Sequence, residues 1–476
     1  MKFRKIAAGV LSVTLLLTAC GQAGEGDSFA RLLTDTEEKN AALNTPTGEL
    51  DAYRYDFEQG GPLLTEAEFS LLRREEKTVG ILTGAEARAE VDYLFRLLRT
   101  YYGLYTWFGG DEAFGAAEER VLRALEGREE IPVGKYQQLL KEALGFVQDG
   151  HFGIGGSGTL EPSALYCAKG ALFDYRDGTF YGGEDLDRAV VSIQGEDPAN
   201  YLKRAIGPEG ELTWKLYRTD VASGRSSAVV TYADGGETLI LDPAGMDPLD
   251  QGKETFRRGT LAGAELLQMT SMPFVPGDAG PEWGYDGATV EAFLAAAEEA
   301  RTADGVLVVG LTSNPGGNGN LPGEWFRAFT GETPEPNYAT LCLDPYDWTC
   351  REGEVKEGEY RVRRPEAQYL EREEGPFLVV LTSRGTASAA EAFTDLTRNV
   401  GRSLVIGSNT GGCLTGSQTY RGYLPWSGTE LAWGLDLFVW PEGYFAEGVG
   451  LEPDVYLTGP DQEARLEQFL HRYLTG

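Results

Sequence analysis

Gly385-Thr386-Ala387-Ser388-Ala389-Ala390-Glu391 is the stretch around which the rest of the sequence is organised. The apolar run before it, residues 377–381, is rich in Val and Leu and predicts a buried strand, and the small residues after Thr386 predict a helix. Ser388 is therefore expected at a strand-to-helix turn, where unpaired N–H groups and the helix dipole favour a developing oxyanion. This makes Ser388 a candidate nucleophile. The alternative is that Thr386 or Ser388 only caps the helix.

The composition is that of a folded protein with an acidic surface. The chain has 476 residues, of which 42% are hydrophobic and 11% aromatic, enough for two or three globular domains. Its formal net charge is −32. Such a surface repels polyanions, so we expect neither nucleic acid nor anionic lipid head groups among its ligands.

The N-terminus has the parts of an export signal. Basic residues among the first five precede the apolar run 6–17, and Leu17-Thr18-Ala19-Cys20 matches the bacterial lipoprotein motif, in which the cysteine is lipidated. A plain secretory signal is the alternative. The run is too short to span a bilayer comfortably, and no second run of sufficient length follows. We therefore expect residues 1–19 to be a signal peptide, and the mature protein to lie outside the cytoplasm, tethered to the bacterial cell membrane through Cys20.

The other cysteines and the two histidines give no metal-binding pattern. There is no CxxC or Cys/His spacing typical of zinc, and His151 and His471 are far apart, so the sequence predicts neither a metal nor a cofactor. Cys342 and Cys350 flank a short loop and could form a disulfide in an exported protein, or remain two free thiols. The remaining two cysteines are Cys167 and Cys413.

Two segments with different patterns follow the signal. Residues 20–62 are polar and acidic without sustained periodicity, which predicts a flexible tether. Residues 63–158 have helical periodicity and predict an N-terminal helical subdomain. Thr83 and Glu86 have the spacing of a capping box at the first helix. The three expected helices span residues 84–102, 111–127 and 135–148.

Residues 159–245 change to the alternation typical of strands, with several turn signals. Within this β-rich module, a strand at 189–195 followed by a helical stretch at 198–206 resembles a PDZ-like unit. A purely structural β-insert explains the same pattern, so both interpretations stay open.

Residues 246–476 predict an α/β core. A Gly-, Pro- and Met-rich stretch at 246–282 predicts a connecting loop, and an irregular charged excursion is expected at 331–375. A strand at 305–311 should lie parallel to the strand at 376–382. The expected helices of this core span residues 288–302, 321–330 and 461–474.

Three further Gly-rich segments accompany the stretch around Ser388: Asn314-Pro315-Gly316-Gly317, Thr410-Gly411-Gly412, and Gly448-Val449-Gly450-Leu451-Glu452-Pro453-Asp454. In that order the set resembles the C-terminal-processing, or tail-specific, serine peptidase family, including its tricorn-like branch with a histidine base. The resemblance implies a mixed α/β (α+β) fold with a crotonase/ClpP-like catalytic core at 246–476. It also implies a serine-type endopeptidase that acts on protein or peptide substrates.

The resemblance assigns roles to residues of the core. Ser388, three residues before Glu391 as in the family pattern, would be the nucleophile. The backbone N–H groups of Ala389 and of Gly316 or Gly317 would bind the oxyanion, because glycine lets the main chain approach the substrate carbonyl. An ordinary β-to-α turn is the alternative for the glycine loop. A phosphate cradle is disfavoured because no Gly-Lys-Ser/Thr completes a P-loop.

The general base distinguishes this chain from the better-known bacterial branch, which uses a lysine after the serine. No lysine follows Lys356, and Cys413 stands at the usual lysine spacing, so a Ser–Lys dyad in that arrangement is excluded. The tricorn-like branch carries its base in an Asp-x-His segment, as in Asp149-Gly150-His151. Glu447 matches its acidic residue and would orient the imidazole, whereas Asp149 is too close in sequence to be the preferred partner. A solvated loop carboxylate is the alternative for Glu447.

A second departure keeps another class of function open. Gly310-Leu311-Thr312-Ser313 stands where the family usually has Asp-Leu-Arg-Gly, which removes the charges of its buried salt links. The chain could therefore be a degenerate relative that binds peptide or polymer ends without cutting, or a solute-binding lipoprotein. His471 is expected at the surface of the last helix. The sequence predicts no oligomeric state.

Overall fold

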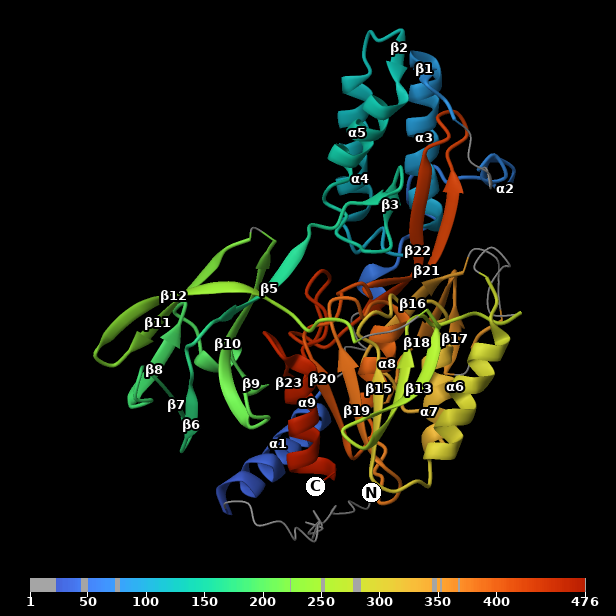
Figure 1. Ribbon diagram of the computed structural model, residues 1–476. Coiled ribbons are helices and arrows are strands. Elements are labelled where there is room, and N and C mark those ends of the chain that lie inside the picture. The colour runs from blue at the N-terminus through green and yellow to red at the C-terminus, as the bar shows by residue number, and fades with distance from the viewer. Residues whose placement is uncertain are drawn as a thin grey trace, which may run out of the picture.

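The computed structural model describes residues 23–43, 50–72, 78–222, 224–249, 253–276, 284–344, 349–351, 353–366 and 369–475. The expected signal peptide and Cys20 lie outside the described residues. Three parts are visible in Figure 1: an α/β core, a β-rich part beside it, and a helical part above it. This mixed α/β architecture agrees with the expected fold class.

The centre of the core is a parallel sheet. β15 (Val306–Gly310) pairs with β19 (Phe377–Thr382), and β19 with β20 (Ser403–Gly407), all in parallel, which confirms the predicted neighbours. Helices α6 (Gly287–Ala300), α7 (Leu321–Thr330) and α8 (Ala389–Arg398) pack on one face of these strands, and α9 (Gln462–Leu470) packs on the other. Burial on both faces explains the continuous apolar runs of the strands.

The stretch 246–282, expected to be a connecting loop, contains a β-hairpin. β13 (Phe256–Leu261) and β14 (Ala264–Met269) pair in antiparallel fashion, and β14 continues the core sheet beside β15. The turn residues Ala262 and Gly263 have φ values of 52° and 81°, as a tight two-residue hairpin requires. The interpretation as a loop was wrong because the four consecutive residues Arg257-Arg258-Gly259-Thr260 of the edge strand β13 give no apolar alternation, and pairing with β14 makes this segment a strand.

The β-rich part continues the same sheet. β9 (Leu202–Ile206) pairs with β10 (Leu212–Val221) and, in parallel, with β23 (Val455–Tyr456) of the core. The helical stretch predicted at 198–206 is therefore wrong beyond a single turn at Pro198–Asn200. Leu202, Ala205 and Ile206 are buried by the sheet, and this tertiary pairing overrides the local pattern.

The domain boundaries remain predictions. The other strands are β5 (Ser163–Ala168), β6 (Asp174–Arg176), β7 (Thr179–Gly182), β8 (Arg188–Ile193), β11 (Ser226–Tyr232) and β12 (Gly235–Ala244).

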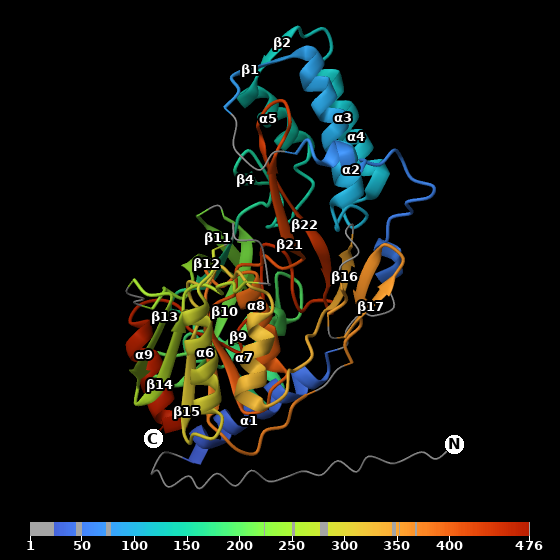
Figure 2. The same cartoon turned by 90° about the vertical axis from the view of Figure 1, so that its right-hand side faces the viewer.

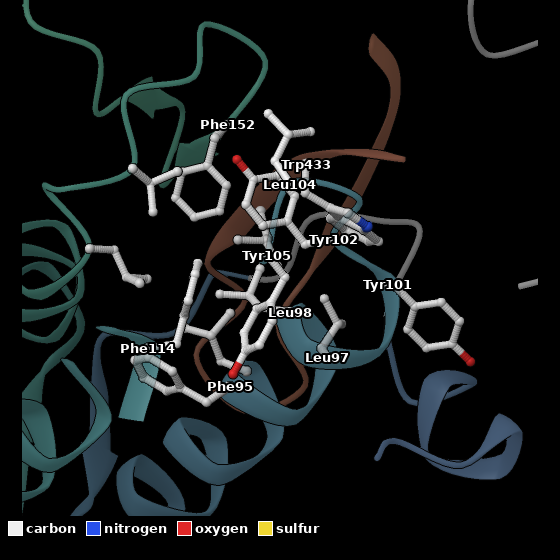
Figure 3. Close-up of a cluster of buried hydrophobic side chains, with 14 of the residues drawn as sticks. Phe95, Leu97, Leu98, Tyr101, Tyr102, Leu104, Tyr105, Phe114, Phe152 and Trp433 are labelled. Atoms are coloured by element: carbon white, nitrogen blue, oxygen red, sulfur yellow. The ribbon is translucent and has the colours of Figure 1, made fainter. Parts of the chain in front are cut away.

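The helical part contains the three predicted helices, α3 (Gly84–Tyr101), α4 (Gly110–Ala124) and α5 (Val133–Ala143). Thr83 and Glu86 form the predicted capping box at the start of α3. The apolar faces of the three helices enclose a cluster that includes Tyr102 and Phe152 (Figure 3). The short elements here are a 3₁₀ turn at Leu50–Tyr53, α2 (Glu66–Phe69), β1 (Ile81–Thr83) and β2 (Glu130–Pro132).

A second sheet joins the helical part to the core. Its long hairpin, β21 (Gly416–Tyr423) and β22 (Glu430–Val439), reaches up beside α3 and α5 (Figure 2). At its tip the buried carboxylate of Glu90 accepts hydrogen bonds from the amides of Trp426 and Ser427, at 2.7 and 2.9 Å. β3 (Gly153–Ile154) pairs with β22 and, on its other side, with β4 (Ser157–Gly158), so the chain just after His151 is fixed to the hairpin.

The segment 331–375 is more regular than expected. It supplies β16 (Ala339–Leu343), β17 (Glu354–Glu357) and β18 (Tyr360–Arg363) to the second sheet. Its charged residues pair within the sheet: Arg361 bonds Glu354 at 2.7 Å, although only 2% of its side chain is exposed. The many charged residues of this segment predicted an irregular, solvent-exposed stretch, whereas in the structure oppositely charged side chains pair with one another. Cys342 and Cys350 are both free thiols.

Part of the expected flexible tether is a helix. α1 (Ala23–Ala41) lies along the core, where Phe29, Leu32 and Leu33 pack against α9 and the following turn. The Phe29 ring stacks on Tyr473 at 5.0 Å. The spacing of these three residues places them on one helical face, a short signal that the surrounding polar residues obscured. Among the described residues, no helix is both long and apolar enough to cross a membrane.

Candidate active site

Ser388 lies at the predicted strand-to-helix turn. It follows β19 and is the N-cap residue of α8, with φ 53° and ψ −123°. Backbone of this kind is costly for a residue with a side chain and persists only where the surroundings enforce it. Backbone strain of this kind is frequent at functional sites, so the conformation of this turn supports a functional role for Ser388.

The imidazole of His151 lies against this serine. Its Nε2 atom is 3.1 Å from Ser388 Oγ, although the two residues are 237 positions apart in sequence. His151 belongs to the loop that leaves the helical part, and Ser388 belongs to the core. The side chain of His151 is only 13% exposed. A hydroxyl and a neutral imidazole in this contact can exchange a proton.

Two further side chains of the described residues lie beside the ring. Cys413 Sγ is 3.6 Å from Nδ1 and 3.9 Å from Nε2, and Asp149 Oδ1 is 3.9 Å from Nδ1. Asp149 is fully buried, and the same oxygen accepts a hydrogen bond from the backbone N–H of His151 at 2.9 Å. The carboxylate nearest to the imidazole is therefore Asp149, which sequence spacing had disfavoured. Cys413, noted in the sequence only as a replacement for lysine, is a contact of the ring.

Burial, more than the local charges, favours the neutral form of His151. Burial lowers the pKa of the imidazole, the negative charge of Asp149 raises it, and the positive charge of Arg421 lowers it again. The net effect is a pKa below the ordinary histidine value. A neutral ring can accept a proton from Ser388, so this environment suits a general base.

Glu447 lies near the histidine loop but bonds the main chain. Its Oε1 accepts from the N–H of Gly150 at 2.7 Å, and its Oε2 accepts from Leu414 and Thr415 at 3.2 and 2.9 Å. Within the part of the chain that the structure describes, it makes no hydrogen bond to the His151 ring. Burial raises the pKa of this carboxyl. The expected contact between Glu447 and the imidazole is therefore absent, and Glu447 instead joins two segments that border the ring.

Glu391 organises the other side of the serine. This fully buried carboxylate accepts hydrogen bonds from Ser388 N at 3.0 Å, Thr410 Oγ1 at 2.6 Å, and the amides of Gly412 and Cys413, each at 2.8 Å. It thus fixes the nucleophile turn to the segment that carries Cys413. Sequence reasoning used Glu391 only as a family marker, although Ser-x-x-Glu is the spacing by which a side chain reaches back to a helix start.

The candidate oxyanion donors differ in their availability. The Gly316 amide donates to Asn314 Oδ1 at 2.9 Å and is thereby engaged. Among the described residues, the Gly317 and Ala389 amides donate no hydrogen bond. The Gly317 and Ala389 amides can therefore donate hydrogen bonds to a ligand oxygen, whereas Gly316 contributes mainly by its close approach to Ser388.

Gly316→Ala should test this close approach. A Cβ at Gly316 would come within 2.7 Å of Ser388 Cβ and 2.8 Å of the Ala389 N atom, and φ is 99° there. We expect the variant to lose about 1–3 kcal/mol of unfolding free energy, as positive-φ and overpacking substitutions do. Reactivity of Ser388 should fall at least tenfold, as measured by fluorophosphonate labelling at equal protein concentration. Gly319→Ala is the control, since a Cβ there would meet no atom within 4 Å.

Hydroxyl groups hold the loop around Gly310-Leu311-Thr312-Ser313, a segment that carries no charged side chain. Thr386 Oγ1 donates to the Leu311 carbonyl at 2.7 Å, Ser383 Oγ donates to the Thr312 carbonyl, and Thr312 Oγ1 accepts from Leu249 N at 3.2 Å. The Gly-Leu-Thr-Ser segment is therefore supported without ion pairs. In the described part of the chain, no group of His, Cys, Asp and Glu side chains is arranged to hold a metal ion.

Comparison with known proteins yields one family match and several distant structural likenesses. Residues 281–457 match the model of peptidase family S41. No curated protein matches the chain. Solved structures to which the chain is similar include mature CPAF (14% identity, 82% of this chain and 96% of that chain, TM-score 0.41) and a putative peptidase from Parabacteroides merdae (13%, 82% and 95%, TM-score 0.40). The photosystem II D1 C-terminal processing protease is another (14%, 79% and 93%, TM-score 0.35). Likeness at this level carries no inference about substrate.

Proposed function

Because residues 281–457 match the model of peptidase family S41, the protein is a serine-type peptidase, and on that premise we propose that Ser388 and His151 perform its chemistry. The family match also confirms the resemblance to the C-terminal-processing peptidases. The observation that carries the proposal is the 3.1 Å contact between Ser388 Oγ and His151 Nε2. Protein chains are the substrate class that follows from the family, and we propose internal peptide bonds as the point of cleavage.

In the proposed reaction, His151 Nε2 takes the proton of Ser388 Oγ as that oxygen bonds to the substrate carbonyl carbon. The carbonyl oxygen becomes an oxyanion, for which the Gly317 and Ala389 amides are the available donors. The imidazolium then returns the proton to the leaving amine, and the C–N bond breaks. Water, deprotonated by the same imidazole, hydrolyses the ester and restores Ser388. One oxyanion donor typically contributes about 3 kcal/mol to transition-state stabilisation.

Two buried carboxylates support this arrangement in the proposal. Glu391 fixes the nucleophile turn through Ser388 N, and Glu447 fixes the histidine loop through Gly150 N. In the described part of the chain, neither carboxyl group hydrogen-bonds to Ser388 Oγ or to the His151 ring. Because each acts through the main chain, replacing it should misplace a reacting group by fractions of an ångström, which is enough to slow catalysis.

Fluorophosphonate labelling tests the proposal most directly. The reagent phosphonylates an activated serine, so we expect one modified residue, Ser388, together with hydrolysis of a generic unfolded protein. A folded protein that is not labelled and does not hydrolyse the substrate would contradict the proposal. That outcome would favour the alternative of a degenerate relative that binds peptides without cutting them.

We further propose that the protein is exported and tethered to the membrane by lipid on Cys20. The support is the N-terminal sequence, in which basic residues, a short apolar run and Leu17-Thr18-Ala19-Cys20 occur in order. Cys20→Ala should remove the lipid, so that the variant either enters the soluble fraction or keeps its signal peptide. Fractionation and mass spectrometry of the N-terminus measure this. Wild-type protein found free in the cytoplasm would contradict it.

A further inference from the structure

Tyr102 is a buried tyrosine whose hydroxyl makes one hydrogen bond to the described residues. It is the first residue after α3, is 1% exposed, and its ring lies 5.4 Å from that of Phe152 and 6.4 Å from that of Phe114 (Figure 3). Its hydroxyl donates to Asp149 Oδ2 at 2.9 Å. A phenylalanine would fill the same apolar space, so packing alone gives no reason for the hydroxyl. What the hydroxyl adds is a fixed direction for the Asp149 carboxylate.

Both oxygens of Asp149 are thereby engaged. Oδ2 accepts from Tyr102, and Oδ1 accepts from the His151 N–H at 2.9 Å while facing Nδ1 of the ring at 3.9 Å. The backbone of Gly416 closes the site from β21, where a Cβ would come within 2.9 Å of both carboxylate oxygens. The carboxylate is fully buried, so water does not screen its charge and it acts strongly on the nearby imidazole.

A tight turn explains how a residue only two positions away can face the ring. Asp149 Oδ1 accepts from the N–H two residues on, and the Asp149 carbonyl accepts from Phe152 N at 3.0 Å. This is the pattern by which Asp side chains brace their own turn. Gly150 has no side chain that would obstruct it, since a Cβ there would lie 2.5 Å from Cys413 Sγ. The turn therefore brings the carboxylate and the imidazole to the same side.

The other groups around the imidazole do not compete for this role. Ser388 Oγ meets Nε2, Cys413 Sγ packs 3.6 Å from Nδ1, and Arg421 on β21 acts as a distant positive charge. The oxygens of Glu447 are taken up by main-chain amides. Asp149 is the negatively charged group that faces the ring.

We propose that Tyr102 and Asp149 are positioning residues for the catalytic base: Tyr102 fixes Asp149, and Asp149 fixes His151 and stabilises its imidazolium. The inference rests on the proposed function, because it assumes that His151 takes the proton of Ser388. The charge on Asp149 favours the imidazolium that forms during the reaction, and Glu447 supports the loop from outside. The hydroxyl that fixes the base therefore comes from the end of α3, in the helical part.

The test compares Tyr102→Phe, Asp149→Asn and Glu447→Gln in the full chain. We expect kcat/KM to fall about 10- to 100-fold for Tyr102→Phe and roughly 10³- to 10⁴-fold for Asp149→Asn, the latter by analogy with loss of the triad carboxylate. Removing the Asp149 charge lowers the pKa of His151, so the acid limb of the pH profile should move to lower pH. The limb should move in the same direction, by less, for Tyr102→Phe. It should stay in place for Glu447→Gln, although the rate falls.

Tyr105→Phe is the matched control. Its hydroxyl also belongs to the aromatic cluster but donates to Asp111 Oδ1 at 2.8 Å, so this variant should keep the wild-type profile. A wild-type profile for Tyr102→Phe, or a limb that shifts only with Glu447→Gln, would overturn the inference. If Asp149→Asn does not fold, the pH profile of Tyr102→Phe still tests the inference. Failure of the wild-type protein to react with a fluorophosphonate would instead refute the proposed function, and the inference with it.

Discussion

Ser388→Ala is expected to lower kcat/KM by about four to six orders of magnitude, because no other group in the proposed reaction can bond to the substrate carbonyl. The fold should be preserved. Ser388 serves α8 through its backbone N–H, which bonds Glu391 at 3.0 Å and is retained in alanine. The positive φ is equally costly for both residues. We therefore expect the unfolding free energy to change by no more than about 1 kcal/mol, the size of a lost cap.

The measurement is hydrolysis of an unfolded protein substrate, combined with denaturant unfolding of the same sample. Ser403→Ala is a suitable control, because Ser403 lies at the start of β20, at the opposite end of the sheet from the site, and its hydroxyl donates to the main-chain carbonyls of Thr397 and Val400. Turnover at the wild-type rate by a folded Ser388→Ala protein would eliminate the proposed mechanism.

His151→Ala is the second substitution with a very large expected effect. Without the imidazole, no neighbouring group among the described residues is suited to take the serine proton: Cys413, which also contacts the ring, has a pKa that burial raises well above the ordinary value. We expect kcat/KM to fall by roughly 10⁴-fold or more. His471→Ala should leave the rate unchanged, because His471 is exposed at the end of α9. An active His151→Ala enzyme would mean that a different base operates.

The same residue predicts the pH dependence of the wild-type enzyme. A base must be neutral to accept a proton, so activity is present above the pKa of His151 and is lost as pH falls through it. Because burial lowers that pKa below the ordinary 6.5, the acid limb of kcat/KM should lie below pH 6.5. An acid limb centred above pH 7 would contradict the conclusion that burial destabilises the imidazolium form of His151.

Much of the core could be read from the sequence because its signals are local. The strand before Ser388, the helix after it and the parallel neighbour at 306–310 follow from apolar runs and small residues, as do the helices of the helical part. The meeting of His151 with Ser388 followed from inventory and family resemblance, since only two histidines exist in the chain. Distance in sequence was no obstacle to that prediction.

The missed features depend on tertiary context. The strand β9 forms because it pairs with β10 on one side and with β23 on the other. The local sequence pattern contains no signal for these two partners. Sequence spacing disfavours Asp149 because only one residue separates it from His151, yet a turn braced by the Asp149 side chain makes that short separation favourable. The family resemblance places Glu447 at the ring, whereas in the structure its Oε1 accepts a hydrogen bond from Gly150 N, a contact that no sequence pattern indicates.

The helix α1 bears on how far the enzyme can search for substrate. A flexible tether from 20 to 62 would have let the body range roughly 35 Å from its anchor. With α1 starting at Ala23 and packed on the core, only Gly21 and Gln22 separate it from Cys20, a span of about 10 Å at full extension. If Cys20 carries lipid, the peptidase would be held close to the bilayer in a restricted orientation. Substrates would then be selected by whether they come to that height above the membrane, as much as by their sequence.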